Sequence, residues 1–438
     1  MQKTIYLLFV FFLTCISISS QTVNRKIITL DELLELADEH NRELRILNYQ
    51  EQISKEVISD EKKNLLPSIE ANLSFSYNGD GSVIERNLSK SIKAEIPSYG
   101  NSFAIEASQI IYAGGAIKSA IRKAEINHSL TQLEKEKVRQ EIRFLIIGYY
   151  LDILKLDNQK IVLEQNITQT KTLLEQIKSK YNEGTILSNN VTRYELQLQS
   201  LELAKMQVEN KIKIANNDLV KLVSLPDGTV LDISDEGINK QVEEIYNDSA
   251  WKSIALTESP ILKKSSLKLE ESKQNENLVK SETRPQVFAF AFNNLTGPIT
   301  IEIPAIDKNF NYWAVGIGIK YNIGNLYKSK SRKSITRLTT KLVEEDNLRI
   351  KEDLMNTIDD SYINFLEVRK VYEIQQKSII LATENYEIIR NRYLNDLVLI
   401  TEMLDAENAK LDAELKAINA QMDILFHFYK LKKITGTL

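Results

Sequence analysis

Two very long stretches of the sequence place apolar residues on a single helical stripe. Residues 326–394 contain neither Gly nor Pro, and residues 116–182 contain only Gly148. Apolar residues recur in the stretch 116–182 at steps of three and four, which is typical of coiled-coil helices. At about 1.5 Å per residue, each stretch predicts a helix roughly 100 Å long. The positions that define the first stripe are Leu130, Leu133, Val138, Ile142, Leu145, Tyr149, Ile153 and Leu156.

Each long helix is followed by a short turn and then by a shorter, returning helix. Gly184 lies in the first turn and suits a left-handed helix cap, a conformation that its counterpart Asp396 also tolerates. A further helix precedes the long one in each half and is predicted to stack end to end with the returning helix. These additional predicted helices are 29–65, 188–224, 254–283 and 399–434.

Four shorter segments alternate apolar residues with polar or small ones, which indicates β-strands with two unlike faces. Their length is that of a strand that crosses a membrane at a tilt, and aromatic residues lie near several ends, as in the girdles of membrane barrels. Amphipathic strands of a soluble sheet are the alternative. The predicted strands are about 68–77, 102–112, 286–293 and 311–322.

The period of two assigns a face to each strand residue. One set is predicted to face lipid: Phe103, Ile105, Trp313, Val315 and Ile317. The charged residues Glu70, Glu106 and Lys320 are predicted to face a lumen. Four strands cannot close a barrel, and unpaired strand edges are not tolerated in lipid. We therefore expect three copies of the chain to supply twelve strands, an even number.

The sequence consists of two similar halves. YLDIL at 150–154 recurs as YINFL at 362–366, an offset of 212 residues, and Lys180-Tyr181 matches Arg392-Tyr393 at the same offset. Each half contains a helix, a proline, two strands, a glycine, a long helix, a turn and a helix. We assign residues 21–224 to the first repeat, 225–253 to an equatorial inter-repeat segment and 254–438 to the second repeat.

The first twenty residues have the pattern of a secretory signal peptide. Lys3 precedes an apolar run from Ile5 to Phe12, and small residues at 17–20 provide a cleavage site. The run is short for a membrane anchor, and the residues before Cys15 form a poor lipidation motif. We predict removal of residues 1–20. No later segment has a charge-free apolar run of transmembrane-helix length.

The amino-acid composition argues against several classes of function. Only 14 Gly and 7 Pro among 438 residues suit long uninterrupted elements. Lys and Arg number 56 against 60 Asp and Glu, a net charge of -4, which provides no field for nucleic acid. One Cys and three His argue against disulfide or metal sites, and no catalytic motif is present. We expect no enzymatic activity, no cofactor and no metal.

Several motifs resemble the TolC-type outer-membrane efflux protein family. The most specific is RY at 392–393 followed by ITEMLDAE at 400–407, which is similar to the family's turn and returning-helix start. QIIYAGG at 109–115 and Leu225-Pro226 are also similar to family positions. The sequence differs from the family where Asp396 replaces a turn glycine.

The resemblance implies a mainly α fold with a small β part. It implies a homotrimer in which a twelve-stranded barrel in the outer membrane continues into a periplasmic α-helical coiled-coil tunnel. Such a channel is the exit duct of an inner-membrane transporter, joined to it by a periplasmic adaptor protein. Gly184 and Asp396 would lie at the periplasmic turns.

The resemblance also implies an acidic aperture at the inner end of the tunnel. Glu402 and Asp405 lie three residues apart and share one helix face, and they match acidic positions of the family motif. Acidic residues also favour any helix N-terminus, so a purely structural role is the alternative. A periplasmic coiled-coil structural or adaptor protein is the alternative for the whole chain.

Overall fold

The computed structural model describes residues 25–234 and 247–438, so the predicted signal peptide at 1–20 lies outside the described residues. The chain packs as two compact units. The strand unit comprises residues 47–135 and 260–352. The hairpin unit comprises the described residues 25–46, 136–234, 247–259 and 353–438. Each unit therefore takes segments from both halves of the sequence.

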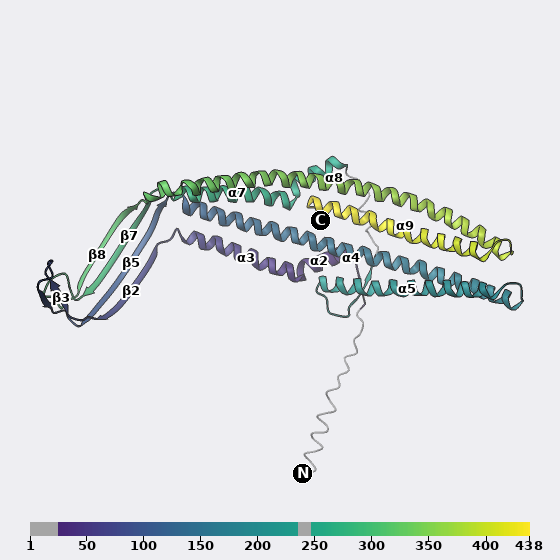
Figure 1. Cartoon of the computed structure of the whole chain (residues 1–438), viewed down its shortest axis with the longest axis horizontal. Coiled ribbons are helices and arrows are strands. Elements are labelled where there is room, and N and C mark those ends of the chain that lie inside the picture. The colour runs from purple at the N-terminus through teal and green to yellow at the C-terminus, as the bar shows by residue number, and fades with distance from the viewer. Residues whose placement is uncertain (1–24, 235–246) are drawn as a thin grey trace, which may run out of the picture. The chain divides into compact units, whose positions relative to one another are not determined.

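The strand unit contains an antiparallel sheet in the order β2-β5-β7-β8 (Figure 1). β2 (Ser68–Tyr77) matches its predicted bounds, whereas β5 (Tyr99–Ala113) and β7 (Gln286–Gly297) are longer than predicted. β8 (Phe310–Lys320) ends two residues before its predicted end. The central pair, β5 with β7, joins the two sequence halves, which the alternation pattern alone could not specify.

A second hairpin lies between β2 and β5 in the sequence. It pairs β3 (Gly81–Ile84) with β4 (Ser91–Ala94), and it was not predicted because each strand is only four residues long. The register of the four-stranded sheet places all four strand–helix junctions at its opposite end, where Ala113 pairs with Gln286 and Gln286 pairs with Lys320.

Helices begin or end directly beside these junctions. α3 (Arg42–Lys63) and α7 (Pro260–Ser281) precede β2 and β7. The two long helices, α4 (Ala116–Asn182) and α8 (Gly324–Leu394), follow β5 and β8. The predicted stretch 116–182 is thus one helix, as is 326–394, because neither contains an interior residue that breaks the hydrogen-bond ladder.

The hairpin unit is built from the far parts of the long helices and their returning partners. α5 (Ser188–Leu222) returns along α4, and α9 (Ile400–Thr435) returns along α8 (Figure 1). All four helices contribute to one apolar cluster. Its buried members are Leu173, Leu174, Ile177, Tyr194, Tyr386, Tyr393, Ile400 and Met403.

The two helices predicted over 29–65 and 254–283 are each interrupted, which corrects the sequence analysis. The first is split into α2 (Leu30–His40) and α3 at Asn41. Asn41 is extended, and its side-chain oxygen accepts hydrogen bonds from the amides of Glu43 and Leu44 at 2.9 and 3.3 Å. An Asn side chain that satisfies first-turn amides favours a new helix start over a continuous helix.

The second interruption separates α6 (Asp248–Glu258) from α7 at Ser259. Pro260 occupies the first position of α7, where its missing amide costs nothing, and it disfavours the helical conformation of the preceding residue. Asn41 and Ser259 are 218 residues apart, the same offset as Pro67 and Pro285. The break is therefore a feature of both repeats.

The predicted inter-repeat segment at 225–253 contains regular structure. β6 (Val230–Ile233) pairs in parallel with β1 (Arg25–Ile28) in the hairpin unit. Asn216 of α5 positions it, since its side chain donates to Thr229 O at 2.9 Å and accepts from the Leu231 amide at 2.8 Å. Part of the segment, 235–246, lies outside the described residues.

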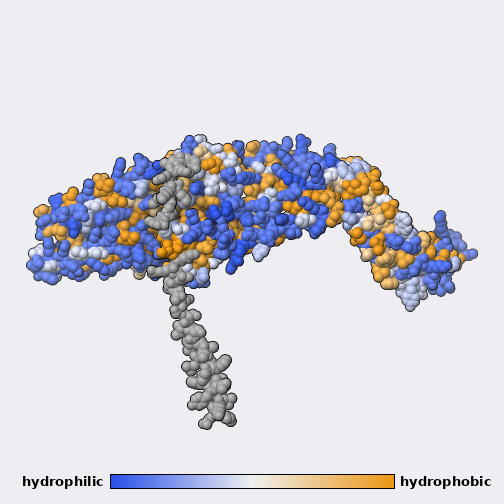
Figure 2. Space-filling view, turned by 180° about the vertical axis from the view of Figure 1, so that it is seen from behind, coloured by the Kyte–Doolittle hydropathy of each residue, from blue (hydrophilic) through white to orange (hydrophobic). Residues whose placement is uncertain are grey.

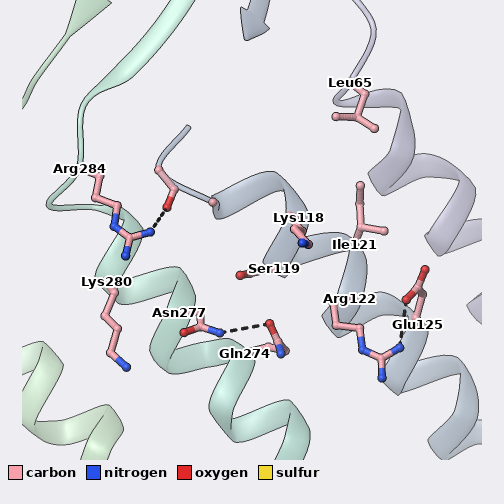
Figure 3. Close-up of a pocket in the computed structure, with 12 residues that line it drawn as sticks. Leu65, Lys118, Ser119, Ile121, Arg122, Glu125, Gln274, Asn277, Lys280 and Arg284 are labelled. Atoms are coloured by element: carbon pink, nitrogen blue, oxygen red, sulfur yellow. Dashed lines mark hydrogen bonds and ion pairs between the residues drawn. The ribbon is translucent and has the colours of Figure 1, made fainter. Parts of the chain in front are cut away.

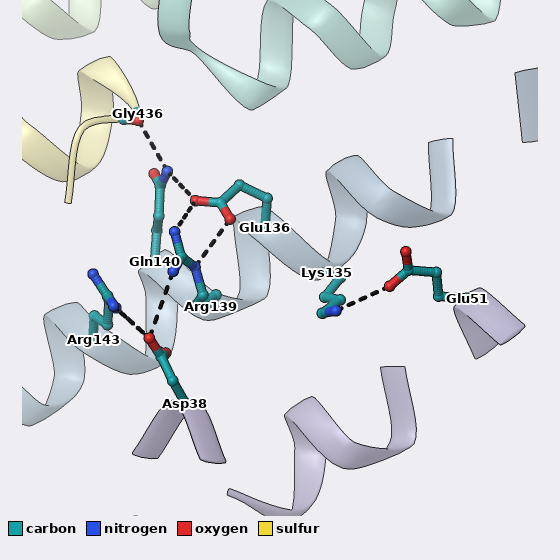
Figure 4. Close-up of polar contacts among 8 residues, drawn as sticks. All are labelled: Asp38, Glu51, Lys135, Glu136, Arg139, Gln140, Arg143 and Gly436. Atoms are coloured by element: carbon teal, nitrogen blue, oxygen red, sulfur yellow. Dashed lines mark hydrogen bonds and ion pairs between the residues drawn. The ribbon is translucent and has the colours of Figure 1, made fainter. Parts of the chain in front are cut away.

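Charged residues connect neighbouring helices inside each unit (Figure 4). In the hairpin unit Asp38 of α2 pairs with Arg143 of α4 and lies 3.5 Å from Arg139. In the strand unit Lys135 Nζ lies 2.9 Å from Glu51 Oε2. Within the described ranges, no helix is both long enough and apolar enough to cross a membrane.

Candidate functional site

The two turns of the hairpin unit have the same backbone geometry. Gly184 and Asp396 both adopt the left-handed conformation, with φ of 74° and 60°. In each turn the amide of the following residue reaches back five positions, from Thr185 to Lys180 O at 3.0 Å and from Leu397 to Arg392 O at 2.9 Å. These bonds satisfy carbonyls at the helix C-terminus. The left-handed caps predicted at Gly184 and Asp396 are confirmed, and their periplasmic location remains a prediction.

A charged side chain connects the two turns. Lys180, near the end of α4, donates to Asp396 Oδ1 at 2.6 Å and to the Leu394 carbonyl at 3.2 Å. A glycine at position 396 would adopt the backbone conformation more easily, but it could not accept this bond. The aspartate therefore adopts the left-handed conformation less easily than a glycine would, but it provides a contact between the two hairpins.

Glu402 and Asp405 lie in the first two turns of α9, as the sequence predicts, and both are exposed. Met403, Ala406 and Glu407 point to the other side and are buried. The two candidate carboxylates are thus on the surface of the hairpin, available to a neighbour or to solvent. Whether they line an aperture depends on chains beyond this one, so that role stays a prediction.

The carboxylate that the fold buries is Glu407, which the sequence analysis quoted only as part of a motif. It is 3% exposed, and its Oε1 accepts a hydrogen bond from Thr170 Oγ1 of α4 at 2.5 Å. Among the described residues, its Oε2 and the hydroxyl of Tyr194 make no hydrogen bond of good geometry, although the two groups interact electrostatically. Its repeat counterpart, Glu195, is about half exposed and pairs with Lys178 at 2.8 Å. Sequence periodicity could not distinguish Glu407 from Glu195, because the burial of each carboxylate depends on which residues of the neighbouring helices pack against it.

Burial controls the ionisation of this cluster. Desolvation raises the pKa of Glu407, and the Thr170 hydrogen bond offsets only part of that effect. Burial also raises the pKa of Tyr194, and the nearby Glu407 charge adds to the shift. Tyr386 is raised to a pKa of about 12 for the same reasons. The Lys410 ammonium lies 4.8 Å from the Tyr386 ring centroid, within range of a cation–π contact.

In the strand unit, register assigns the two faces of the sheet. Ala71, Ile105 and Trp313 lie on one face, because Ala71 pairs with Ile105, Ile105 with Asn293, and Asn293 with Trp313. The five residues predicted to face lipid all belong to this face and are exposed: Phe103 36%, Ile105 42%, Trp313 71%, Val315 71% and Ile317 72%. Hydrophobic residues gather over the sheet (Figure 2). Contact with lipid itself remains a prediction.

The opposite face carries the predicted lumen residues. Glu70 pairs directly with Glu106, and Glu106 pairs with Phe292. Lys320 shares this face through its pairing with Gln286. The three charges therefore lie together on one face, and the apolar set lies on the other.

The same polar face also carries aromatic rings that the sequence analysis did not assign. Neighbouring ring centroids are 5.4 to 6.3 Å apart along Phe288, Phe290, Phe292, Tyr312 and Phe310. Gly316 and Gly318 lie opposite Phe290 and Phe288, and an added Cβ would come within 2.7 and 2.4 Å of those rings. The glycines thus make room for rings to lie across β8. The alternation of Phe with Ala at 288–292 predicts a strand, but it does not indicate on which face of the sheet the rings lie.

The strand unit also contains a groove between α4 and α7, beside the strand–helix junctions (Figure 3). Its volume is about 870 Å³, and four cationic side chains line it: Lys118, Arg122, Lys280 and Arg284. Arg284 donates to the Gly114 carbonyl at 2.8 Å. A Cβ on Gly114 would lie 2.8 Å from Arg284 Cβ, so only glycine allows this close approach.

Comparison with known proteins shows what the chain resembles. The sequence profile of the family described as outer membrane efflux protein matches residues 33–224. This match confirms the resemblance indicated by the motifs, and it spans most of the first repeat. No curated protein sequence matches the chain significantly.

Solved structures of outer-membrane channels share the fold over almost the whole chain. VceC from Vibrio cholerae has a TM-score of 0.76 at 14% identity, covering 93% of this chain and 96% of VceC. The CmeC channel of Campylobacter jejuni has a TM-score of 0.74 at 14% identity, with coverages of 93% and 85%. The open state of MtrE from Neisseria gonorrhoeae has a TM-score of 0.75 at 16% identity, with coverages of 93% and 88%. At these identities the similarity establishes the fold.

Proposed function

We propose that this chain is the outer-membrane exit duct of a tripartite efflux or secretion system. Three copies close a twelve-stranded barrel in the outer membrane, and their helical hairpins form a coiled-coil tunnel in the periplasm. The duct is a passive conduit. It receives cargo from an inner-membrane transporter through a periplasmic adaptor protein and performs no chemistry of its own.

The main support for this proposal is the four-stranded sheet of the strand unit, with its unpaired edges and its exposed apolar face. β2 and β8 each pair on one side only among the described strands, and one face of the sheet is apolar and exposed. An exposed apolar face with two open edges is a liability in water, and open edges are unsatisfied in lipid. Pairing β8 of one copy with β2 of the next satisfies both edges, and three copies supply the even strand number of a membrane barrel.

The same assembly gives a role to Glu402 and Asp405. In a trimer these exposed residues supply six carboxylates near the turns of the hairpin unit. A ring of carboxylates attracts cations and repels anions at a constriction. The two residues are therefore candidates for the periplasmic aperture.

The proposal is tested by locating the edges of the sheet in the native membrane. The only cysteine, Cys15, lies in the predicted signal peptide, so the mature chain offers a cysteine-free background. Single cysteines are placed on β2 at Leu73 and on β8 at several positions from Phe310 to Ile317, and pairs are combined in one chain. Oxidation should produce covalent trimers for at least one pair, in outer-membrane fractions.

Function is measured in parallel by planar-bilayer recording of the purified protein. Long-lived conductance from heat-modifiable trimers supports the duct. A protein that fractionates as soluble periplasmic monomer, without conductance or β2–β8 crosslinks, contradicts it and favours a coiled-coil structural or adaptor protein.

A further inference from the structure

The groove between α4 and α7 begins where the strands end. Gly114 and Gly115 connect β5 to α4, and Arg284 lies between α7 and β7. Leu65, two residues after the end of α3, and Ile121, on α4, form apolar parts of the lining. The groove therefore combines apolar and cationic side chains at the level where the apolar face of the sheet stops.

The start of α4 lacks the groups that normally satisfy a helix N-terminus. Gly115 precedes the first helical residue and has no side chain to cap the first-turn amides. The first turn of α4 contains no acidic residue, although acidic residues are favoured there by the helix dipole. Lys118 instead places a cation at the positive end of the helix dipole, which is unfavourable. An anion bound at this end would offset that unfavourable interaction and accept hydrogen bonds from the free amides.

Two of the four cations in the groove have no carboxylate to neutralise them. Arg122 lies 3.3 Å from both Glu125 and Glu270, and Lys280 lies 3.1 Å from Glu276. Within the described chain, Lys118 has no ion-pair partner. Among the described residues, Arg284 has no ion pair, and its guanidinium donates to the neutral carbonyl of Gly114. Two positive charges therefore face the groove uncompensated.

A serine hydroxyl points into the same space. Ser119 is 8% exposed, lines the groove, and its Oγ has no hydrogen-bond partner among the described residues. Figure 3 shows this side chain directed into the gap between α4 and α7. The residue as a whole is more than nine-tenths buried, while its hydroxyl is open to the groove and can donate or accept a hydrogen bond there. This polar group is independent of the cations and is available to a hydrogen-bonding ligand.

We propose that this groove binds the phosphate of an anionic phospholipid headgroup. The ammonium of Lys118, the guanidinium of Arg284, the Ser119 hydroxyl and the first-turn amides of α4 contact the phosphate. Leu65 and Ile121 contact the start of an acyl chain. Basic pockets beside membrane-spanning segments recognise lipid headgroups in this way. The assignment to a lipid rests on the proposed function, because a barrel of these strands places the groove at the membrane surface.

The test measures lipid retained by the purified trimer with native mass spectrometry, using phosphatidylglycerol and phosphatidylcholine as probes. The wild type should retain phosphatidylglycerol in preference. Lys118→Gln removes one charge and should weaken phosphatidylglycerol binding about fivefold, whereas Lys118→Arg should keep it. Ser119→Leu fills the groove and should reduce binding independently of charge. The matched control is Lys273→Gln, which also removes one charge and lies on α7 outside the groove lining.

The outcomes separate the alternatives. Retention that is equal for both lipids, or unchanged by both groove variants, overturns the proposal. Binding of inorganic phosphate by calorimetry, without preferential lipid retention, assigns the site to a free anion and overturns the lipid. If the protein does not insert and conduct at all, the duct itself fails. Conducting trimers without phosphatidylglycerol preference exclude the lipid site alone.

Discussion

The Nζ atom of Lys180 lies 2.6 Å from Oδ1 of Asp396, and this contact joins the end of α4 to the turn between α8 and α9. The two residues are 216 positions apart and belong to different sequence repeats. Asp396 holds a left-handed backbone conformation, with φ of 60°, to make the contact. The turn thus combines a conformational cost with an interhelical bond.

Substitutions at position 396 separate these two effects. Asp396→Gly removes the bond but relieves the backbone, so its net effect on unfolding free energy should be within about 1 kcal/mol, since an ion pair whose carboxylate is 72% exposed contributes little. Asp396→Ala removes the bond and keeps the strain, which costs about 1–2 kcal/mol more. Chemical denaturation of the hairpin unit in the intact protein provides the measurement. Equal destabilisation by Gly and Ala would show that the left-handed turn is not a constraint.

Glu407→Gln should alter the pH dependence of stability. Because burial raises the folded-state pKa of Glu407 above its ordinary value of 4.5, the protonated form is favoured in the folded protein. The stabilisation that protonated Glu407 gives the folded state is fully present below pH 4.5 and is lost as the pH rises through the raised pKa. Glutamine cannot ionise, so the variant should be more stable than the wild type at neutral pH and similar at low pH.

Unfolding midpoints measured from pH 4 to pH 8 test this expectation. Glu195→Gln is the matched control, because that carboxylate is about half exposed and paired with Lys178. A wild-type profile parallel to that of Glu407→Gln across the whole range would mean that Glu407 is ionised without cost.

Arginine substitutions test the faces of β8. Ile317→Arg places a charge on the exposed apolar face and should cost about 2–4 kcal/mol if that face lies at the middle of a membrane. The sequence alone suggests Gly318→Arg as the control on the other face. The structure rejects it, because any Cβ at Gly318 would come within 2.4 Å of the Phe288 ring. Tyr312→Arg is the suitable control, since its side chain is 44% exposed on the polar face.

The fraction of protein recovered as folded trimer in the outer membrane measures the difference. Ile317→Arg should reduce it strongly and Tyr312→Arg only slightly. Similar recovery of both variants would refute the assignment of the two faces.

Removal of the candidate aperture charges should change how cations block the channel. Glu402→Ala with Asp405→Ala should weaken the block of single-channel current by multivalent cations added from the periplasmic side, because fewer carboxylates attract them. Glu175→Ala with Glu384→Ala removes the same number of exposed charges from the same unit and should leave the block unchanged. If both double variants behave like the wild type, Glu402 and Asp405 are only charges at a helix start.

The long helices, both turns and all four main strands could be predicted, because each depends on local patterns. Residues 116–182 carry a regular apolar stripe without proline, so the helix bounds followed directly. The breaks at Asn41 and Ser259 were missed, since a capping side chain or a first-position proline competes with an otherwise continuous helical pattern. The short β3–β4 hairpin was missed because four-residue strands carry too little alternation.

Some residues of the candidate sites could likewise be predicted from the sequence, and others could not. The apolar set on β5 and β8 could be assigned to one face, since a period of two fixes which residues share a side. The aromatic rings at 288–292 could not be placed, because their side depends on the register of β7 against β5 and β8. Arg284 and Ser119 are 165 residues apart, and no local pattern indicates that they line one groove.

The sequence by itself determined the periodic elements, the internal repeat and the family resemblance, because these depend on residue order over short spans. The tertiary structure decided which carboxylate is buried, Glu407 rather than its counterpart Glu195. It also decided that Lys180 meets Asp396 and that β5 pairs with β7. The physical reason is that burial, ion pairing and strand register are properties of two segments in contact. Contacts between residues 200 positions apart are fixed only when the packed helices and the sheet bring them together.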